Sequence, residues 1–440
     1  MPEATRSIPL ASAADARREV TQFRNTYRRL VWEDQVAEWG RLRAYKAALK
    51  APARAAREAY RTVREHGPRA RRTTGVSLPV QFIRFWWLRL RHGITDDTFY
   101  RYQMYRGDRW PRATHFVQVK ETAHIYRVIG ARGFRRAVET LTDKRRFAEW
   151  CAGHGVPTPP VLAEFAGGRM TRDATRGTLP ASDLFSKSGA DYGGKKVCHW
   201  RYVRDGIYEA DGRQWTGAEL LESLAAESAA GPMVLQVRLR NHPSLAPLAP
   251  AALSTIRVVT CRRVGGPARE VLAVFRMGVG GAVADNYARG GIVSPIDLAT
   301  GELGPAVRFD ETRYDFTTFS AHPDTGASIA GVRLPRMAEA LQMARRAHDL
   351  LGELPCIGWD VAPLEHGPVL LEGNWNPCVK IAQLPGGVPL AETEFVACLN
   401  AHLRQCFPAP DWSAMRPLAH WNPHGEIKQL GTVGVPTLVD

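Results

Sequence analysis

The chain has 440 residues, of which 45% are hydrophobic and 23% charged, so a disordered protein is excluded and two or three packed domains are expected. Its formal charge of +15 resides in the N-terminal third, because residues 1–150 hold 32 Lys and Arg against 15 Asp and Glu, a net charge of +17. Seven cysteines without a CxxC pair argue against a disulfide framework or a zinc ribbon. With no apolar stretch that suits a signal peptide or a membrane span, these features predict a soluble, cytoplasmic protein.

The first 110 residues are predicted to form a basic, mainly helical region. Between Ala13 and Tyr60 apolar residues recur at three- and four-residue steps, which predicts helices with one packed face and one cationic face. The residues expected on the packed face are Phe23, Tyr27, Leu30, Val31, Leu42, Tyr45 and Leu49.

Residues 81–92 (QFIRFWWLRLRH) mix aromatic residues with arginines. This pattern suits a helix in the headgroup region of a membrane, because Trp and Arg both favour that layer. It also suits an ordinary helix that packs its aromatic residues on the next domain, and we favour this interpretation because buried aromatic residues are common. Peripheral membrane contact through the basic region stays an alternative, whereas nucleic-acid binding is not expected.

From about Thr142 the sequence has the texture of an α/β protein. Thr142 suits an N-cap and Gly155 a stop for a helix over residues 142–155, and residues 217–228 and 335–354 predict two more helices. Runs rich in β-branched residues predict strands at Asp183–Lys187, Lys195–Tyr202, Met233–Arg238, Thr255–Arg263, Glu270–Met277, Ile357–Ala362 and Val369–Gly373.

The last two of these strands carry three oxygen-bearing side chains. Glu372 and Asn374 lie two residues apart and so share one side of a strand, and Asp360 lies across from them in the predicted hairpin. Carboxylate and amide oxygens are the ligands that Mg²⁺ prefers. The pattern predicts an Mg²⁺ site, also open to Mn²⁺, at Asp360, Glu372 and Asn374, although turn capping by the same residues is the alternative.

A second group places Lys187 at a strand end, directly before the glycine-rich segment SGADYGGKK. Glycines such as Gly189, Gly193 and Gly194 let backbone N–H groups close on phosphate oxygens, and a lysine supplies a point charge. The segment is not a P-loop, because GxxxxGK[ST] is absent. A flexible hairpin with solvated lysines is the other interpretation.

Arginines follow on two further predicted strands and in a loop. Arg257 lies in the run TIRVVT, Arg276 ends the next strand, and Arg289 belongs to the segment DNYARGG. Guanidinium groups match phosphates and carboxylates and stabilise charge that develops during phosphoryl transfer, so these residues are candidate catalytic groups. Ordinary surface charges on strands are the alternative.

Taken in chain order, these motifs resemble the ATP-grasp superfamily, and specifically its sugar-transfer associated family, over about residues 100–391. The most specific segments are NHPSLAPL…STIRVVT, DNYARGGIVSPIDLATG and IGWDVAP…LLEGNWNP. The resemblance implies an α+β chain with the ATP-grasp fold, in which two α/β subdomains clasp ATP, preceded by the basic helical region. The expected parts are residues 1–110, the ATP-lid part 111–230, the catalytic part 231–405 and a tail 406–440.

The resemblance also implies roles for individual residues. Lys144 and Lys187 are expected to contact the ATP phosphates, and the Gly189–Gly194 loop is expected to close over them. Backbone groups of Gln236, Val237 and Arg238 are expected near adenine, with His242 near the ribose.

For the reacting groups, the resemblance implies one or two Mg²⁺ ions on Asp360, Glu372 and Asn374. The groups expected to stabilise the transferring phosphoryl group and to position the acceptor are Arg257, Arg276, Asn286 and Arg289. One departure from the superfamily pattern is Gly373, which stands between Glu372 and Asn374 where an apolar residue is usual.

The implied reaction converts a carboxylate to an acyl phosphate, from which an amine displaces phosphate. We therefore expect a carboxylate–amine ligase with ATP and Mg²⁺ as cofactors and small molecules as substrates. The expected acceptor of the activated carboxylate is an amino sugar or another small biosynthetic intermediate. The alternatives are a kinase of a small acceptor and a non-catalytic nucleotide sensor that docks through its basic region. A homodimer is the default oligomeric state.

Overall fold

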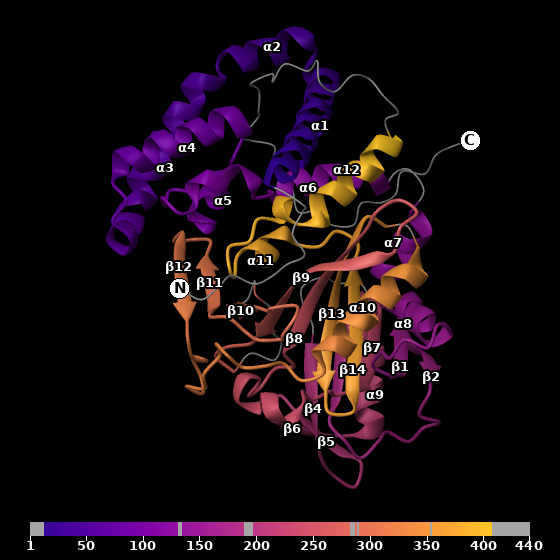
Figure 1. The fold of residues 1–440 in the computed structure, drawn as a ribbon. Coiled ribbons are helices and arrows are strands. Elements are labelled where there is room, and N and C mark those ends of the chain that lie inside the picture. The colour runs from indigo at the N-terminus through magenta and orange to yellow at the C-terminus, as the bar shows by residue number, and fades with distance from the viewer. Residues whose placement is uncertain are drawn as a thin grey trace, which may run out of the picture.

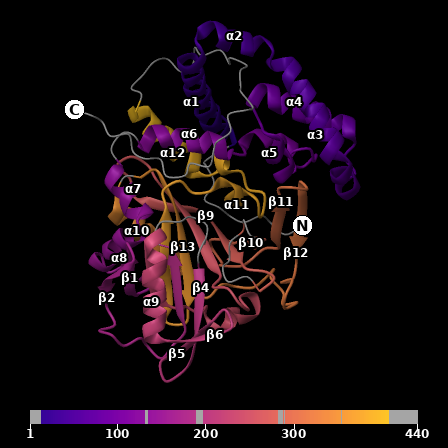
Figure 2. The same cartoon turned by 180° about the vertical axis from the view of Figure 1, so that it is seen from behind.

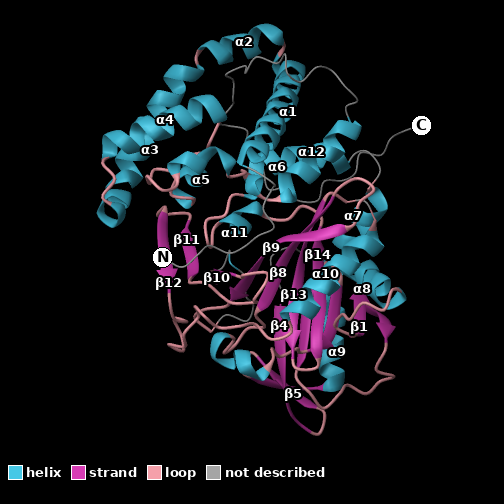
Figure 3. Cartoon of the chain, viewed as in Figure 1, coloured by secondary structure: helices cyan, strands magenta, loops and turns pink. Residues whose placement is uncertain are grey.

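The computed structural model describes residues 13–130, 134–188, 197–281, 287, 290–352 and 354–406. The helices near the two ends of the described chain gather at one end of the molecule, and the strands, with further helices beside them, fill most of the rest (Figure 3). The predicted α+β class with a helical N-terminal region is confirmed. Over the described residues, no helix has both the length and the apolar character needed to cross a membrane.

From residue 13 on, where the structure describes it, the N-terminal region holds six α-helices, which lie at the upper end of Figure 1. Arg24 on the first helix donates from Nε to Glu121 Oε1 on the sixth at 2.9 Å, and both side chains are buried. This ion pair joins the first and sixth helices of the region to each other. The helices are α1 (Ala13–Trp39), α2 (Arg41–Leu49), α3 (Ala51–Thr74), α4 (Leu78–His92), α5 (Asp96–Arg101) and α6 (Val119–Gly130).

The predicted packed face of this region is only half correct. Phe23, Tyr27 and Leu30 are buried as predicted. Leu42, Tyr45 and Leu49 are exposed instead, and the alanines of α2 face inward in their place. Small residues allow close approach to the neighbouring helices, which large side chains would prevent.

The first of two sheets has seven strands in the order β2-β1-β7-β3-β4-β5-β6, and all neighbours are antiparallel. Helix α9 (Gly217–Glu227) covers one face, with Leu220 and Leu224 buried against the sheet (Figure 2). The strands are β1 (Val161–Ala166), β2 (Arg169–Asp173), β3 (Leu184–Ser188), β4 (Val197–Arg204), β5 (Ile207–Ala210), β6 (Arg213–Thr216) and β7 (Met233–Val237).

The second sheet also has seven antiparallel strands, in the order β12-β11-β10-β9-β8-β13-β14. Residues of α1, α6 and α12 pack on one of its faces, and residues of α7, α8 and α10 pack on the other. The strands are β8 (Thr255–Arg262), β9 (Ala268–Met277), β10 (Ile292–Pro295), β11 (Ala306–Asp310), β12 (Asp315–Phe319), β13 (Cys356–Leu364) and β14 (Gly367–Asn374). The remaining helices are α7 (Arg135–Thr142), α8 (Lys144–Gly153), α10 (Met337–Leu351), α11 (Val379–Gln383) and α12 (Glu394–Cys406).

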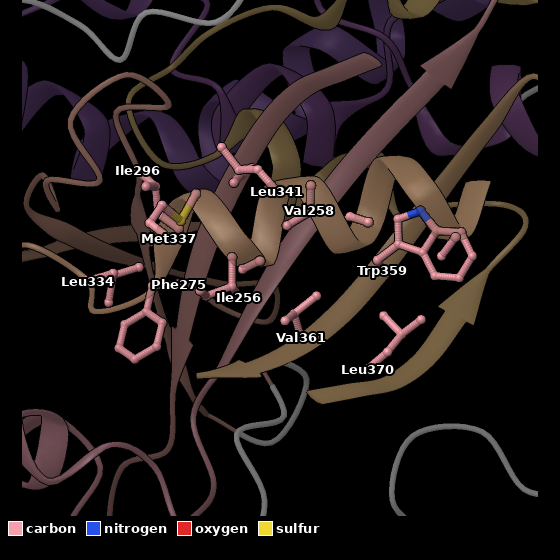
Figure 4. Packing of buried hydrophobic residues seen from close by; sticks show 14 of the residues in the cluster. Ile256, Val258, Phe275, Ile296, Leu334, Met337, Leu341, Trp359, Val361 and Leu370 are labelled. Carbon is pink, nitrogen blue, oxygen red and sulfur yellow. The ribbon is translucent and has the colours of Figure 1, made fainter. Parts of the chain in front are cut away.

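The core under α10 fixes the central strands. Met337 and Leu341 on the helix pack with Ile256 and Val258 of β8 and with Trp359 of β13 (Figure 4). Because alternate residues of a strand point to opposite faces, this packing turns Arg257 and Asp360 to the other side of the sheet. Packing of the apolar residues on one face of the sheet therefore directs the polar residues that alternate with them to the opposite face.

One predicted helix start is wrong. Thr142 ends α7, and Asp143 caps α8, since its side chain accepts from the backbone N–H groups of Arg145 and Arg146 at 2.9 and 3.1 Å. An aspartate carboxylate at the N-cap is as good an acceptor for these N–H groups as a threonine hydroxyl, so the helix is as well capped by Asp143 as it would be by Thr142. It makes Lys144 the first residue of α8.

Candidate active site

The centre of the site is a buried carboxylate between two arginines. Asp360 on β13 is paired in register with Arg257 on β8, and Arg257 donates to both of its carboxylate oxygens, from Nη2 to Oδ2 at 2.9 Å. Arg276 on β9 also donates from Nη2 to Oδ2 at 2.9 Å. Burial alone would raise the pKa of Asp360, but the two positive charges outweigh it and hold the pKa well below its usual range.

Arg276 is held from a second side by Thr255. The hydroxyl of Thr255 accepts from Nε and Nη2 of Arg276 at 2.9 and 2.6 Å, and the two residues are register partners across β8 and β9. Thr255 is a residue of the candidate site that the sequence analysis did not single out, although it begins the motif TIRVVT. Its signal is the two-residue spacing from Arg257, which places both on one face of β8.

Glu372 on β14 faces Asp360 from the other neighbouring strand. The two residues are register partners, and burial together with the charge of Asp360 raises the pKa of Glu372. Asn374 donates from Nδ2 to Glu372 Oε1 at 3.2 Å and to the carbonyl oxygen of Gly358 at 3.4 Å. The predicted trio of oxygen-bearing side chains is therefore together at one place.

The trio fits a hard cation in the chemistry of its donors. Two adjacent carboxylates repel each other, and a bound Mg²⁺ would relieve that repulsion. Within the described part of the chain, no group of three His, Cys, Asp or Glu could hold a metal ion. The described residues therefore do not form a metal site made of protein ligands alone. Mg²⁺ ordinarily binds one or two carboxylates, and nucleotide phosphates complete its coordination shell.

Two lysines approach the carboxylates from the first half of the fold. Lys187 lies on β3, and its pKa falls to about 8 because of burial and the nearby charge of Lys144, with Glu372 opposing the shift. Lys144 at the start of α8 donates from Nζ to the carbonyl oxygen of Ser188 at 2.7 Å. The candidate phosphate ligands and the candidate metal ligands thus share one electrostatic environment.

In the segment Gln236–Arg238, which was predicted to contact adenine, most polar groups already bond or pair with other parts of the protein. Gln236 pairs in register with Val161 and Phe185 on its two sides, and its Nε2 donates to Pro159 O at 3.3 Å. The backbone N–H of Arg238 donates to Asp183 O at 2.8 Å. Val237, register partner of Leu184, is the last residue of β7, so a ligand must use groups at or beyond this end of the strand.

Of the remaining predicted site residues, the structure describes only His242. Nδ1 of His242 accepts from the backbone N–H of Ser244 at 3.2 Å, so His242 caps the turn after β7. Five predicted residues lie outside the described part of the chain, namely Gly189, Gly193, Gly194, Asn286 and Arg289.

Asp183 is a charged residue that the sequence analysis placed only at the start of a strand. Its Oδ2 accepts from Arg240 Nη2 at 3.0 Å and from Arg238 Nη1 at 3.3 Å, and His199 lies 3.2 Å away. No sequence pattern predicts this cluster, because its members come from three separate segments.

Several solved structures show limited similarity to the chain. An N5-carboxyaminoimidazole ribonucleotide synthetase in its ADP complex is 11% identical, with a TM-score of 0.32 over 55% of this chain and 46% of that chain. The ATP-grasp ligase PsnB, bound to a phosphomimetic precursor variant, Mg and ADP, is 16% identical with a TM-score of 0.33 over 62% and 60%. A D-alanine–D-alanine ligase from Bacillus anthracis is 14% identical with a TM-score of 0.32 over 61% and 68%. The chain spans less than two thirds of the length of the first two.

A search of curated proteins gives no significant match. The family model described as sugar-transfer associated ATP-grasp matches residues 129–395, which is more than half of the chain and includes every described residue of the site. The chain therefore belongs to the sugar-transfer associated ATP-grasp family.

Proposed function

We propose that the chain is an ATP-dependent ligase that activates a carboxylate as an acyl phosphate and joins it to an amine, releasing ADP and phosphate. The observation that supports this most is the meeting of Asp360, Glu372, two arginines and two lysines between the two halves of the fold. Phosphoryl transfer needs positioning and charge neutralisation more than covalent help, and these residues provide both.

Lys187 and Lys144 bind the ATP phosphates in this proposal. With a pKa of about 8, Lys187 is mostly protonated at neutral pH, and a phosphate beside it would stabilise the charged form further. The glycine segment after β3, with Gly189, Gly193 and Gly194, is proposed to cover the phosphates. Adenine is proposed to lie beyond Val237 at the end of β7, with His242 nearby.

Asp360, Glu372 and Asn374 are the residues that would hold Mg²⁺. Held by these residues, Mg²⁺ would neutralise charge on the nucleotide phosphates. Asp360 has a second task, because its ion pairs keep the guanidinium groups of Arg257 and Arg276 in fixed positions. A carboxylate engaged by two arginines keeps lone pairs for a cation, since each of its oxygens accepts more than one bond.

The two arginines are proposed to stabilise charge as the phosphoryl group moves. A substrate carboxylate attacks the γ-phosphorus, the bond to the bridging oxygen of ADP breaks, and an acyl phosphate forms. The amine then attacks the acyl carbon, phosphate leaves, and the nitrogen loses a proton. Asn286 and Arg289 are proposed to position the acceptor, for which an amino sugar or another small amine is the expected class.

We retain the division into a basic helical region (1–110), an ATP-lid part (111–230), a catalytic part (231–405) and a tail (406–440) as part of this proposal. The lysines then belong to the second part and the carboxylates to the third. ATP would bind between them.

The test is release of ADP by the purified protein with Mg²⁺ and ATP, against a panel of paired carboxylates and amines. Glu372→Gln and Lys187→Gln should abolish substrate-dependent release. Glu365→Gln, an exposed residue in the turn of the same β13–β14 hairpin, is the matched control and should keep wild-type release.

Mass spectrometry of the product separates the alternatives. An amide with free phosphate supports ligation, whereas a stable phosphorylated product formed without any amine indicates a kinase. ATP binding without release of ADP for any pair would favour a nucleotide sensor and contradict the proposal.

A further inference from the structure

Exposed large hydrophobic side chains are concentrated on α2, α3 and α4. Over the part of the chain that the structure describes, these are Leu42, Tyr45, Leu49, Tyr60, Val80, Ile83 and Trp87, and only Met170 and Leu350 lie elsewhere. Leu49 exposes 82% of its surface and Leu42 exposes 68%. Single exposed apolar residues are ordinary, but a gathering of this kind marks an interaction surface.

On α2 and α3 these side chains form a continuous stripe. Leu42, Tyr45 and Leu49 follow each other at steps of three and four residues, and Ala53 and Tyr60 extend the stripe along α3. Lys50 between the two helices keeps a right-handed helical backbone, with φ −84° and ψ −7°, so the stripe is not interrupted. The opposite stripe, which includes Ala44, Ala48, Ala55 and Ala59, is buried.

Helix α4 repeats this arrangement. Phe85 and Leu88 are fully buried in the cluster shared with α3, while Val80, Ile83 and Trp87 stand at steps of three and four residues and are exposed. The helix therefore packs one face on the protein, as the favoured sequence interpretation requires. Its other face has the composition of an interfacial helix.

The same three helices carry a strong positive charge. Residues 41–92 hold 14 Lys and Arg against only two acidic residues, a net charge of +12. One of the two, Glu58, accepts from Nη2 of the buried Arg89 at 2.6 Å and is thereby neutralised. Arg41, Arg43 and Lys46 are exposed beside the apolar stripe of α2. Figures 1 and 2 show these helices at the end of the molecule remote from β5 and β6.

We propose that the exposed apolar and basic surface of α2, α3 and α4, here called the α2–α4 surface, docks on an anionic lipid bilayer. Leucine, isoleucine and tryptophan side chains would enter the boundary between headgroups and acyl chains, and the flanking arginines and lysines would contact lipid phosphates. The charge of the surface complements the negative charge of such a bilayer.

Nucleic acid fits this surface less well. Phosphate backbones are bound by cationic and hydrogen-bonding groups, and these would explain the arginines alone. The exposed aliphatic groups of Leu42, Leu49 and Ile83 gain nothing from a phosphate backbone. A bilayer uses both kinds of side chain.

The experiment is co-sedimentation of the full chain with vesicles of phosphatidylcholine alone and of an equal mixture with phosphatidylglycerol, at low and high salt. The wild type should partition into the mixed vesicles at least about tenfold more strongly than into neutral ones, and less at high salt. Leu42→Glu with Leu49→Glu, and separately Ile83→Glu, should lower that partition by about tenfold or more. Circular dichroism and thermal unfolding check that each variant is folded.

Met170→Glu is the matched control, because Met170 is an exposed apolar residue on the distant strand β2. It should bind the mixed vesicles as the wild type does. The proposal is wrong if the wild type stays in the supernatant with every vesicle, or if the Leu42 and Ile83 variants bind undiminished. A competition experiment gives a further test. The proposal is also wrong if duplex DNA or RNA displaces the wild type from the mixed vesicles at a lower concentration than added competing lipid does.

Discussion

Trp359 lies directly against Gly373 across the β13–β14 pair. The two are register partners, and a Cβ at position 373 would lie 2.6 Å from Cζ3 of the Trp359 ring and 2.7 Å from Cδ2 of Leu141. The indole of Trp359 occupies the space that a side chain between Glu372 and Asn374 would need. This packing explains why glycine stands where the superfamily usually has an apolar residue.

Gly373→Ala should lower the free energy of unfolding by about 1–3 kcal/mol, because overpacking forces the strand or the ring to move. It should also lower ADP release, since Glu372 and Asn374 lie on either side of the displaced residue. Urea unfolding measures the first effect and the ligase assay the second.

A double-mutant cycle identifies the cause. Trp359→Leu vacates the space, so Gly373→Ala should cost less in that background than in the wild type. Gly266→Ala, where the nearest contact of a Cβ is an ordinary 3.5 Å, is the control. Equal stability of Gly373→Ala and the wild type would show that the close packing does not constrain position 373.

Asp360→Asn should destabilise the protein by about 3–5 kcal/mol, because it leaves two arginine charges without a full partner in a buried site. Asp360 is only 3% exposed. Glu270→Gln removes a partner of Arg345 near the surface and should cost about 1 kcal/mol or less. Urea unfolding at low and high salt gives the comparison, and a loss for Asp360→Asn as small as that for Glu270→Gln would contradict the assigned role of the ion pairs.

Sequence patterns predicted the central strands well because these are the most apolar ones. The run Thr255–Arg263 became β8 (Thr255–Arg262), where seven of eight residues are buried. The strands β2, β5, β6, β10, β11 and β12 were missed, since each is only four or five residues long, and β2 and β6 are also largely exposed. Short edge strands carry little apolar alternation, and their pairing partners decide their conformation.

The candidate site was predictable in part. The period of two placed Glu372 and Asn374 together, and the short hairpin brought Asp360 opposite them. The contact of Arg257 with Asp360 was not predictable, because β8 and β13 are about a hundred residues apart and the register between distant strands is not readable from either sequence. The sequence analysis therefore treated as separate sites what is one ion-pair network.

His348 should make the stability of the protein fall at acidic pH. It is fully buried, with Nδ1 2.7 Å from the hydroxyl of Thr260 and Nε2 2.7 Å from the carbonyl oxygen of Leu354. Burial lowers its pKa to about 4, below its ordinary value of 6.5. Between pH 6.5 and 4 the imidazole is therefore protonated in the unfolded chain but neutral in the folded chain. The free energy of unfolding falls across this range as pH is lowered, by up to about 1.4 kcal/mol per pH unit.

His348→Gln should flatten this part of the profile relative to the wild type, whatever its stability at neutral pH. His366→Gln, an exposed residue in the β13–β14 turn, should keep the wild-type slope. Thermal or urea unfolding from pH 7.5 to 4.5 provides the profiles. Identical slopes for the wild type and His348→Gln would rule out His348 as a source of acid sensitivity.

Lys187→Met should raise stability and weaken ATP binding at once. The pKa of Lys187 is lowered from 10.5 to about 8, mainly by burial and then by Lys144, so its charge opposes folding below pH 8 and the opposition fades as pH rises towards 10.5. An uncharged side chain of similar length removes this cost, for an expected gain of about 1 kcal/mol after allowance for partial solvent contact. The same change removes a charge proposed to bind phosphate, and ATP affinity should fall by about tenfold or more.

Lys144→Met separates the two effects. Lys144 donates to Ser188 O, so its replacement should weaken ATP binding without stabilising the free protein. Urea unfolding of the nucleotide-free protein and calorimetric titration with Mg²⁺ and ATP measure the two quantities for each variant. If Lys187→Met lowers stability and leaves ATP affinity unchanged, Lys187 is a structural residue and the phosphate site must lie elsewhere.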